Sequence, residues 1–168
     1  SEGGLESDFL PEVLSWADHH RMAVYIRVWY QDVSVYPDFM AAQYRQQAKA
    51  SLAAALHLIQ PHPSVLAVDL DQRWLLDVDW WGERRYGVPY LGQASLDYLP
   101  TWLAARFTTI DALNTAWGKT YTTFADVLND TTIISAGQVL DLDRSAWRLD
   151  IIAYTLWTMD DFMADILS

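Results

Sequence analysis

Residues 65–71 have the sequence VLAVDLD, a short run of aliphatic side chains that predicts a β-strand. Side chains alternate between the two faces of a strand, so the aliphatic residues at even positions share one face, and Asp69 and Asp71 share the other. A second run, AVYIRVW at residues 23–29, alternates aliphatic with amphipathic side chains and predicts another strand. The sequence patterns indicate these two strands clearly and no others.

Helical patterns occupy most of the remaining chain. The predicted helix between the strands begins at Asp38, a favourable N-cap residue, and runs to about Gln60, where Pro61 stops it. Further helices are predicted at residues 9–20, 95–106 and 109–117, with a helical turn at 124–128 and a final helix from Asp141 or Asp143 to the C-terminus. Because helices alternate with strands, the sequence predicts one α/β domain over residues 1–168, with parallel strands and long helices.

The final helix is apolar on more than one side. Its main stripe follows 3-4-3-4-3 spacing and consists of Leu149, Ile152, Leu156, Met159, Met163 and Ile166. Further apolar surface on this helix comes from Trp147, Ile151, Tyr154 and Trp157. Parallel sheets are normally covered on both faces, which two strands cannot achieve alone. We therefore expect either strands that the patterns do not reveal, or completion of the fold by another protein chain or by self-association.

Charge and composition exclude several classes of function. The chain has 22 acidic and 11 basic residues and a net charge of -11, so it offers no basic patch for nucleic acid or for an anionic membrane surface. It has no cysteine, which excludes disulfides and thiolate sites. No apolar run is long enough for a membrane helix, and no signal-peptide pattern is present. The compartment is left open, the outside of the cell included, and the start at Ser1 predicts a processed or excised form.

The most specific segment is residues 102–121, WLAARFTTIDALNTAWGKTY. It resembles the stretch after the fourth barrel strand in the β-galactosidases of glycoside hydrolase family 42, where an LN-x-AWG block precedes a short aromatic turn. Residues 62–69, HPSVLAVD, resemble that family's entry into the fourth strand. The resemblance spans nearly the whole chain but implies only the third and fourth strand units, and therefore a partial TIM-barrel-like segment of a (β/α)8 fold.

The LN-x-AWG block also has a structural explanation. Thr109 is placed to cap a helix that ends at Gly118, and apolar side chains at i, i+3 and i+7 share one face of that helix. These side chains are Ile110, Leu113 and Trp117. We therefore expect the block to support the fold rather than to perform chemistry.

The resemblance also implies where catalytic residues would stand. Retaining glycosidases need two carboxyl groups about 5 Å apart, an acid/base and a nucleophile. The family's acid/base is a Glu that follows an Asn after the fourth strand, and here Gln72 and Arg73 stand at those two positions. Arginine cannot deliver a proton at neutral pH, because its pKa exceeds about 12. The family's nucleophile comes from the seventh strand, which the third and fourth strand units do not include. No catalytic residue is therefore assigned, and no glycosidase activity is expected of the chain alone.

Carboxylates and aromatic rings are the remaining candidates for a cleft. Asp69, Asp71 and Asp77 are candidate cleft carboxylates, and in a barrel the first two would point inward near the mouth. An ion-pair network with Arg27 or Arg73 is favoured over a relocated acid/base, and a metal site is the weakest alternative, so no metal or cofactor is predicted. Residues 74–90 predict a long loop whose rings could stack on sugars. The candidates are Trp74, Trp80, Trp81, Tyr86 and Tyr90.

Three functions remain open at the level of sequence. The first is a glycoside-hydrolase-like segment that binds carbohydrate without catalysing hydrolysis on its own. The second is a structural or assembly subunit that completes its fold with a partner chain. The third is a fragment of an active β-galactosidase-like enzyme.

Overall fold

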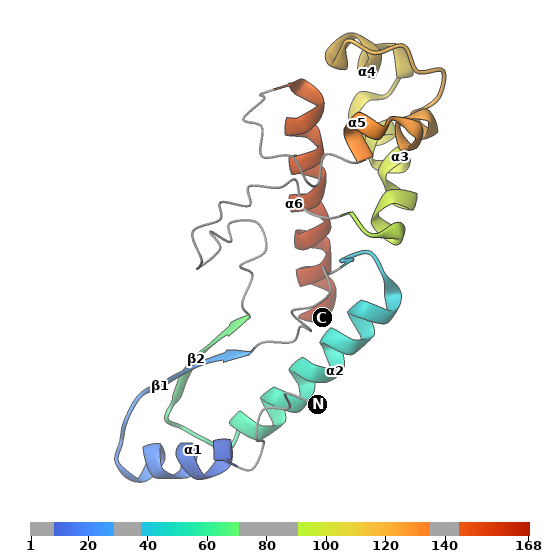
Figure 1. Ribbon diagram of the computed structural model, residues 1–168. Helices are drawn as coiled ribbons and strands as arrows, with labels where there is room; N and C mark the ends of the chain where they lie inside the picture. Colours follow the sequence, from blue (N-terminus) through green and yellow to red (C-terminus); the bar gives the residue numbers. More distant parts are fainter. Residues whose placement is uncertain (1–8, 29–37, 71–90, 135–144) are drawn as a thin grey trace. The chain divides into compact units, whose positions relative to one another are not determined.

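The computed structural model describes residues 9–28, 38–70, 91–134 and 145–168 (Figure 1). In chain order the elements are α1 (Phe9–His19), β1 (Val24–Val28), α2 (Ala42–Ile59), β2 (Val65–Leu70), α3 (Gln93–Phe107), α4 (Ile110–Trp117), the 3-10 helix η2 (Phe124–Asn129), α5 (Thr131–Ile134) and α6 (Ala146–Ile166). They form two compact units. The first unit contains residues 1–31 and 47–72, and the second contains residues 32–46 and 73–168. Most described residues are helical.

The first unit is built on a parallel pair of strands. β1 and β2 lie side by side and parallel, with Val24 opposite Val65 and Val28 opposite Leu70 (Figure 1). Helix α2 forms the connection between them, which is the crossover that a parallel pair requires. The carboxyl ends of both strands therefore lie at the same edge of the sheet. The prediction of parallel strands is confirmed.

Apolar side chains on these strands remain exposed. Leu66 is 76% exposed and Tyr25 is 62% exposed. Among the residues of this unit whose burial is described, the buried apolar ones come from the helices: Leu14, Ala17, Ala48, Leu52 and Ile59. For Leu66 and Tyr25, the expectation that two parallel strands leave apolar surface uncovered is confirmed.

Helix α1 ends in a turn that places Arg21 in a left-handed conformation. The φ angle of Arg21 is 54°, and the Met22 amide donates a hydrogen bond of 2.9 Å to the carbonyl of Ala17. This i to i+5 bond is the Schellman pattern of helix ends, in which glycine is favoured at the left-handed position. An L side chain there is strained because its Cβ approaches the backbone.

We therefore expect the Arg21→Gly substitution to stabilise the first unit by about 1 kcal/mol, because glycine adopts a positive φ without this strain. The measurement is the free energy of unfolding from urea titration. Arg21→Ala is the matched control, since it removes the same long side chain but keeps the Cβ. Equal stability of the glycine and alanine variants would contradict the prediction.

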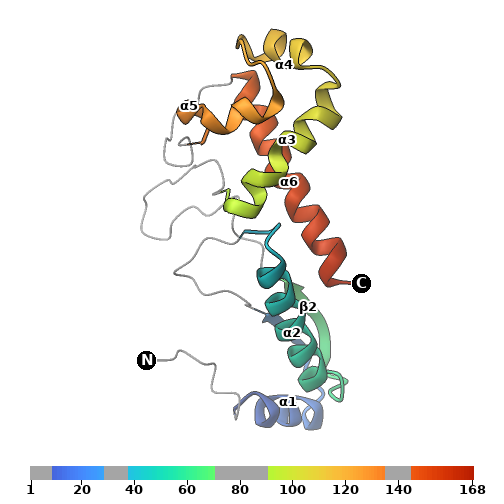
Figure 2. The ribbon, with the colours of Figure 1, turned by 90° about the vertical axis from the view of Figure 1, so that its right-hand side faces the viewer.

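The second unit has a helical core. Helix α3 lies beside α6 in both views (Figures 1 and 2). The buried side chains that make up the core come from every helix after the strands: Leu99, Leu103, Leu113, Trp117, Val127, Ile133, Ile151 and Tyr154. The aliphatic positions of α3 and α4 thus face α6, and η2 and α5 close the same cluster.

The LN-x-AWG block has the supporting role expected of it. Thr109 caps α4, accepting a hydrogen bond of 3.2 Å from the Ala112 amide, and Gly118 ends the helix with a φ angle of 65°. The side-chain amide of Asn114 makes two hydrogen bonds of 2.8 Å to the backbone of Tyr121, one donated and one accepted. Asn114 therefore holds the returning chain against α4.

Helix α6 corrects the prediction for the C-terminal stripe. The described helix begins at Ala146, while Asp141 and Asp143 lie outside the described residues. Of the predicted stripe, Met159 and Ile166 are buried, but Leu149 is 57% exposed and Leu156 is 47% exposed. The buried face is instead formed by Ile151, Tyr154, Thr155, Thr158, Met159, Phe162 and Ile166, together with Asp150. Because the helix is apolar on several sides, spacing alone could not determine which side packs in this unit.

One carboxylate is buried within this core. Asp150 is 6% exposed and pairs with Arg106, whose Nη2 atom lies 2.6 Å from the carboxylate. The indole N–H of Trp117 donates a second hydrogen bond of 2.8 Å to the other carboxylate oxygen. The guanidinium also lies over the ring of Trp102, 5.3 Å from its centroid. A buried charge with these partners ties α3, α4 and α6 together.

Candidate functional site

The carboxyl edge of the two strands is the first candidate site. The strand register places Arg27 opposite Asp69, so the backbone makes neighbours of two residues that were predicted to pair. Their ion pair stays a prediction. The other predicted site residues lie outside the described residues: Asp71, Gln72, Arg73, Trp74, Asp77, Trp80, Trp81, Tyr86 and Tyr90. Arg27 and Asp69 are thus the predicted residues that the described backbone brings together.

The segments that leave this edge end at two residues that are in contact. Residues 29–37 connect β1 to Asp38, and residues 71–90 connect β2 to Leu91 and Gly92. The carboxylate of Asp38 accepts hydrogen bonds from the Ala94 amide at 2.8 Å and the Ser95 amide at 3.1 Å. It also accepts one from the Ser95 hydroxyl at 2.5 Å. Both connections therefore end at a common junction within the second unit.

Asp38 thus caps a different helix from the one predicted. The sequence suggested that it starts the helix of residues 38–60, but α2 begins at Ala42 and the Asp38 carboxylate satisfies the first amides of α3. Helix α3 has Gly92 at its N-cap position, which offers no side chain for capping. A carboxylate from a distant segment supplies the missing acceptor, where the helix dipole also favours negative charge.

Gly92 permits this close approach. A Cβ atom on residue 92 would lie 2.5 Å from both the Cβ and the Cγ atoms of Asp38, which is far inside normal contact distance. The φ angle of Gly92 is -68°, so the backbone itself would accept any residue. The requirement for glycine at position 92 therefore comes from the close approach of Asp38 and not from the backbone conformation.

We expect Gly92→Ala to destabilise the wild-type chain by roughly 1–3 kcal/mol, because the added methyl group would collide with Asp38. In an Asp38→Gly background, which also removes the Cβ atom at position 38, the same substitution should cost about 0 kcal/mol or stabilise the fold, because alanine restricts the unfolded chain. A double-mutant cycle of urea titrations measures the difference. An equal cost of Gly92→Ala in both backgrounds would show that the contact does not exist.

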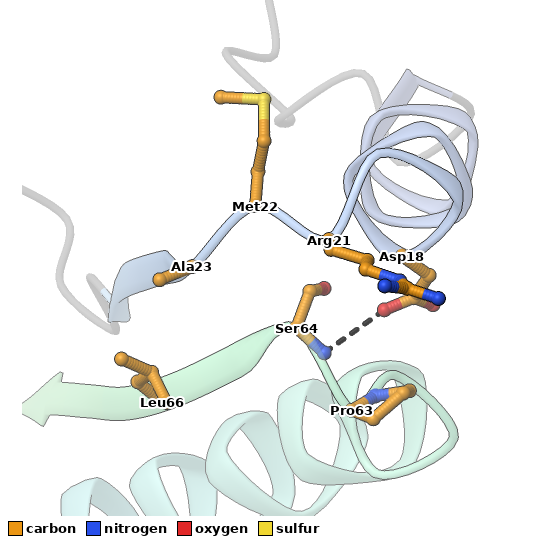
Figure 3. A pocket seen from close by; sticks show the side chains of 7 residues that line it. All are labelled: Asp18, Arg21, Met22, Ala23, Pro63, Ser64 and Leu66. Atoms are coloured by element: carbon orange, nitrogen blue, oxygen red, sulfur yellow. Dashed lines mark hydrogen bonds between the residues drawn. The ribbon is translucent and has the colours of Figure 1, made fainter.

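A second candidate lies at the opposite, amino-terminal edge of the strands. A hollow of about 320 Å3 opens there (Figure 3). It is lined by Asp18, Arg21, Met22, Ala23, Pro63, Ser64 and Leu66. Its polar residues come from the end of α1 and the residues just before β2. The hollow is therefore a candidate site that lies within the first unit alone.

Asp18 is the centre of this second site. Its carboxylate accepts a hydrogen bond of 2.9 Å from the Ser64 amide and lies 2.6 Å from Nδ1 of His62. Hydrogen bonding from Ser64, together with the imidazole of His62, holds the pKa of Asp18 below its usual value. The Ser64 hydroxyl is buried and makes no hydrogen bond of normal geometry, so we assign the contact to the amide.

The contacts around Asp18 connect two parts of the first unit and do not activate a nucleophile. The carboxylate fastens the end of α1 to the residues that open β2, and the Ser64 hydroxyl does not contact the imidazole of His62. Asp18 was not among the residues predicted to form a site, because an aspartate in the last turn of a helix gives no distinct signal in the sequence. In parallel α/β folds this edge of the sheet supports stability, while ligands bind at the carboxyl edge.

The part of the chain that the structure describes contains neither a metal-binding cluster nor a helix that could span a membrane. No group of three histidine, aspartate or glutamate side chains is placed there to hold a metal ion. The proposed oxygen ligands Asp71 and Asp77 lie outside that part of the chain. None of the described helices is both long and apolar enough to cross a membrane.

The fold of this chain resembles part of two solved agarase structures. No family model matches the sequence, and no curated protein matches it. Among solved structures, 92% of the chain aligns with 23% of the agarase AgWH50C, with a TM-score of 0.53 and 19% identity. An exo-β-agarase aligns over 91% of this chain and 22% of its own, with a TM-score of 0.54 and 16% identity. The chain shares its fold with part of these glycoside hydrolases.

The alignments with the two agarases cover only part of those enzymes. The chain spans less than a quarter of the length of each agarase, and the low identity supports likeness of fold alone. The expected glycoside-hydrolase-like fold is therefore supported, whereas the assignment to the β-galactosidases of family 42 stays a prediction.

Proposed function

We propose that this chain is the segment of a glycoside-hydrolase-like (β/α)8 barrel that carries the third and fourth strand units, and that it binds carbohydrate without hydrolysing it on its own. The observation that carries the proposal is the parallel strand–helix–strand unit within a chain that aligns over 91–92% of its length with two agarases. Its resemblance to family 42 in residues 102–121 supports the same assignment from the sequence.

The carboxyl edge of the strands is the part of such a fold that meets ligands. Asp71, Gln72 and Arg73 follow β2 directly, at the positions where the resemblance implies an asparagine and a catalytic glutamate. A guanidinium group there can donate hydrogen bonds to sugar hydroxyls, but it cannot protonate a leaving glycosidic oxygen. We therefore assign binding, not acid catalysis, to this edge.

Aromatic residues in the following segment are proposed to supply the sugar-binding surface. We expect the double substitution Trp80→Ala and Trp81→Ala to abolish retention of the protein in native gels that contain agarose or a neutral galactan, because two stacking surfaces are lost. Trp16→Ala is the matched control, since Trp16 is 54% exposed but belongs to α1. Unchanged retention of the double variant would remove this segment from the site.

An assay of hydrolysis distinguishes the proposed binding function from the alternative that the chain is an active fragment of a β-galactosidase-like enzyme. We expect no release of nitrophenol from an aryl β-galactoside by the purified chain, since Arg73 stands where the proton donor is needed. A full-length family 42 β-galactosidase is the positive control. Turnover that follows the concentration of the chain and persists through purification would refute the absence of activity.

A structural or assembly role is the second candidate, and exposed apolar side chains favour it. The side chains of Leu66, Leu149 and Leu156 are 76%, 57% and 47% exposed, and apolar side chains left exposed in one chain can be buried in a complex. This function requires a stable complex with another chain or a second copy. Light scattering of the purified chain distinguishes the two: a monodisperse monomer that binds no apolar dye speaks against assembly.

A further inference from the structure

The hollow at the amino-terminal edge of the strands has the size and the lining of a small-molecule site. Its volume of about 320 Å3 lies at the lower end of the roughly 300–1,000 Å3 of ligand pockets in proteins, which is room for one small ring rather than for a chain. Polar residues line one part of the hollow and apolar residues line the rest. All of them belong to the first unit, so the hollow lies wholly within that unit.

A buried hydroxyl group at this hollow lacks a hydrogen bond. Ser64 is 9% exposed, and its Oγ atom has no hydrogen-bond partner among the described residues, although its amide donates to Asp18. Figure 3 shows the Ser64 side chain directed toward the segment of Arg21 and Met22, which also lines the hollow. An unsatisfied buried hydroxyl destabilises a fold, and a ligand that bonds to it removes this cost. Ser64 therefore offers a hydrogen bond to a bound molecule.

The guanidinium group of Arg21 is a second polar group without a partner. The residue is exposed, and its guanidinium makes no ion pair or hydrogen bond with the residues that the structure describes. Its φ angle of 54° places Arg21 where glycine is favoured, so an arginine is kept there at a cost in strain. Residues held in such conformations are concentrated at binding and catalytic sites. A ligand of the hollow would account for both the strain and the unpaired guanidinium.

The charges in the hollow favour a neutral ligand that carries hydroxyl groups. Arg21 and Asp18 bring one charge of each sign, so a ligand with a net charge meets a like charge there. A hydroxyl both donates and accepts, so neighbouring hydroxyls on one ring can accept from a guanidinium and donate to a carboxylate. The exposed apolar side chains of Met22 and Leu66 suit the C–H groups of the same ring. We propose that the hollow binds a single neutral sugar ring, with Arg21, Ser64 and Asp18 as its hydrogen-bonding residues.

This site goes beyond the proposed function and uses other residues. The proposed site follows the carboxyl end of β2, whereas the hollow lies at the amino-terminal ends of the strands (Figure 3). The two share only the class of ligand, and a free monosaccharide tests the hollow without any polysaccharide. Failure of one site can therefore be told from failure of the other.

The test is a titration of the isotope-labelled intact chain with D-galactose, followed through the amide signals of Met22, Ala23 and Ser64. We expect these signals to shift, and we expect Arg21→Gly and Ser64→Ala each to weaken binding about tenfold, because each removes one hydrogen-bonding group. Neither variant should unfold at a lower urea concentration than the wild type, since one relieves strain and the other removes an unsatisfied hydroxyl. Lys49→Ala is the matched control, because it removes a positive charge of the same unit outside the hollow.

Loss of affinity without loss of stability supports the inference, because purely structural roles of Arg21 and Ser64 would leave the affinity for galactose unchanged. Unchanged affinity in both variants overturns it. A Ser64→Ala variant less stable than the wild type also overturns it, because the hydroxyl would then have a partner within the fold. D-galacturonate, D-galactosamine and L-leucine are the anionic, cationic and zwitterionic probes, and tighter binding of any of them overturns the neutral ligand.

Comparison with the polysaccharide separates the two sites. If galactose shifts none of these amide signals while agarose still retains the chain, the inference fails and the proposed function stands. If galactose shifts them while no polysaccharide retains the chain, the inference stands and the proposed function fails.

Discussion

The carboxylate of Asp38 is the contact on which the second unit depends most. It accepts three hydrogen bonds from Ala94 and Ser95, the first residues that need an acceptor in α3. Tyr154 then uses the carbonyl of Ser95 as its own acceptor, so the position of α6 against α3 rests on the same turn. Gly92 is required because any side chain there would occupy the space of Asp38. One carboxylate thus joins the segment before α2 to the first turn of α3.

This unit is also held by ion pairs that are shielded to different degrees. The pair of Arg106 with the buried Asp150 has two further partners, the indole of Trp117 and the ring of Trp102. The pair of Arg45 with Asp161 is closer to the surface, where the aspartate side chain is 43% exposed. The Arg106 side chain is itself 47% exposed, so this pair is also partly screened by water; what distinguishes Asp150 is that its buried carboxylate links residues of α3, α4 and α6.

Polar residues lie at both edges of the two-stranded sheet. At the amino-terminal edge, the Asp18 carboxylate contacts the Ser64 amide and the His62 imidazole and so fastens the end of α1 to the residues before β2. At the carboxyl edge, the register sets Arg27 opposite Asp69, and the next residues along the chain are Asp71, Gln72 and Arg73. In parallel folds the second edge is the one that serves ligands. The chain shares its fold with part of two agarases, and Arg73 stands where the resemblance to family 42 implies a carboxylic acid.

The sequence by itself determined the order and type of the main elements. Strand alternation at residues 23–29 and 65–71, proline at 61, and the cap and stop of α4 at Thr109 and Gly118 are local features, and local features can be read from local sequence. Tertiary structure decided what each side chain faces. Asp38 caps α3 rather than α2, and α6 buries Tyr154 and Phe162 while Leu149 and Leu156 stay exposed. These outcomes depend on which distant segment arrives beside a residue, and neither helical spacing nor residue type carries that information.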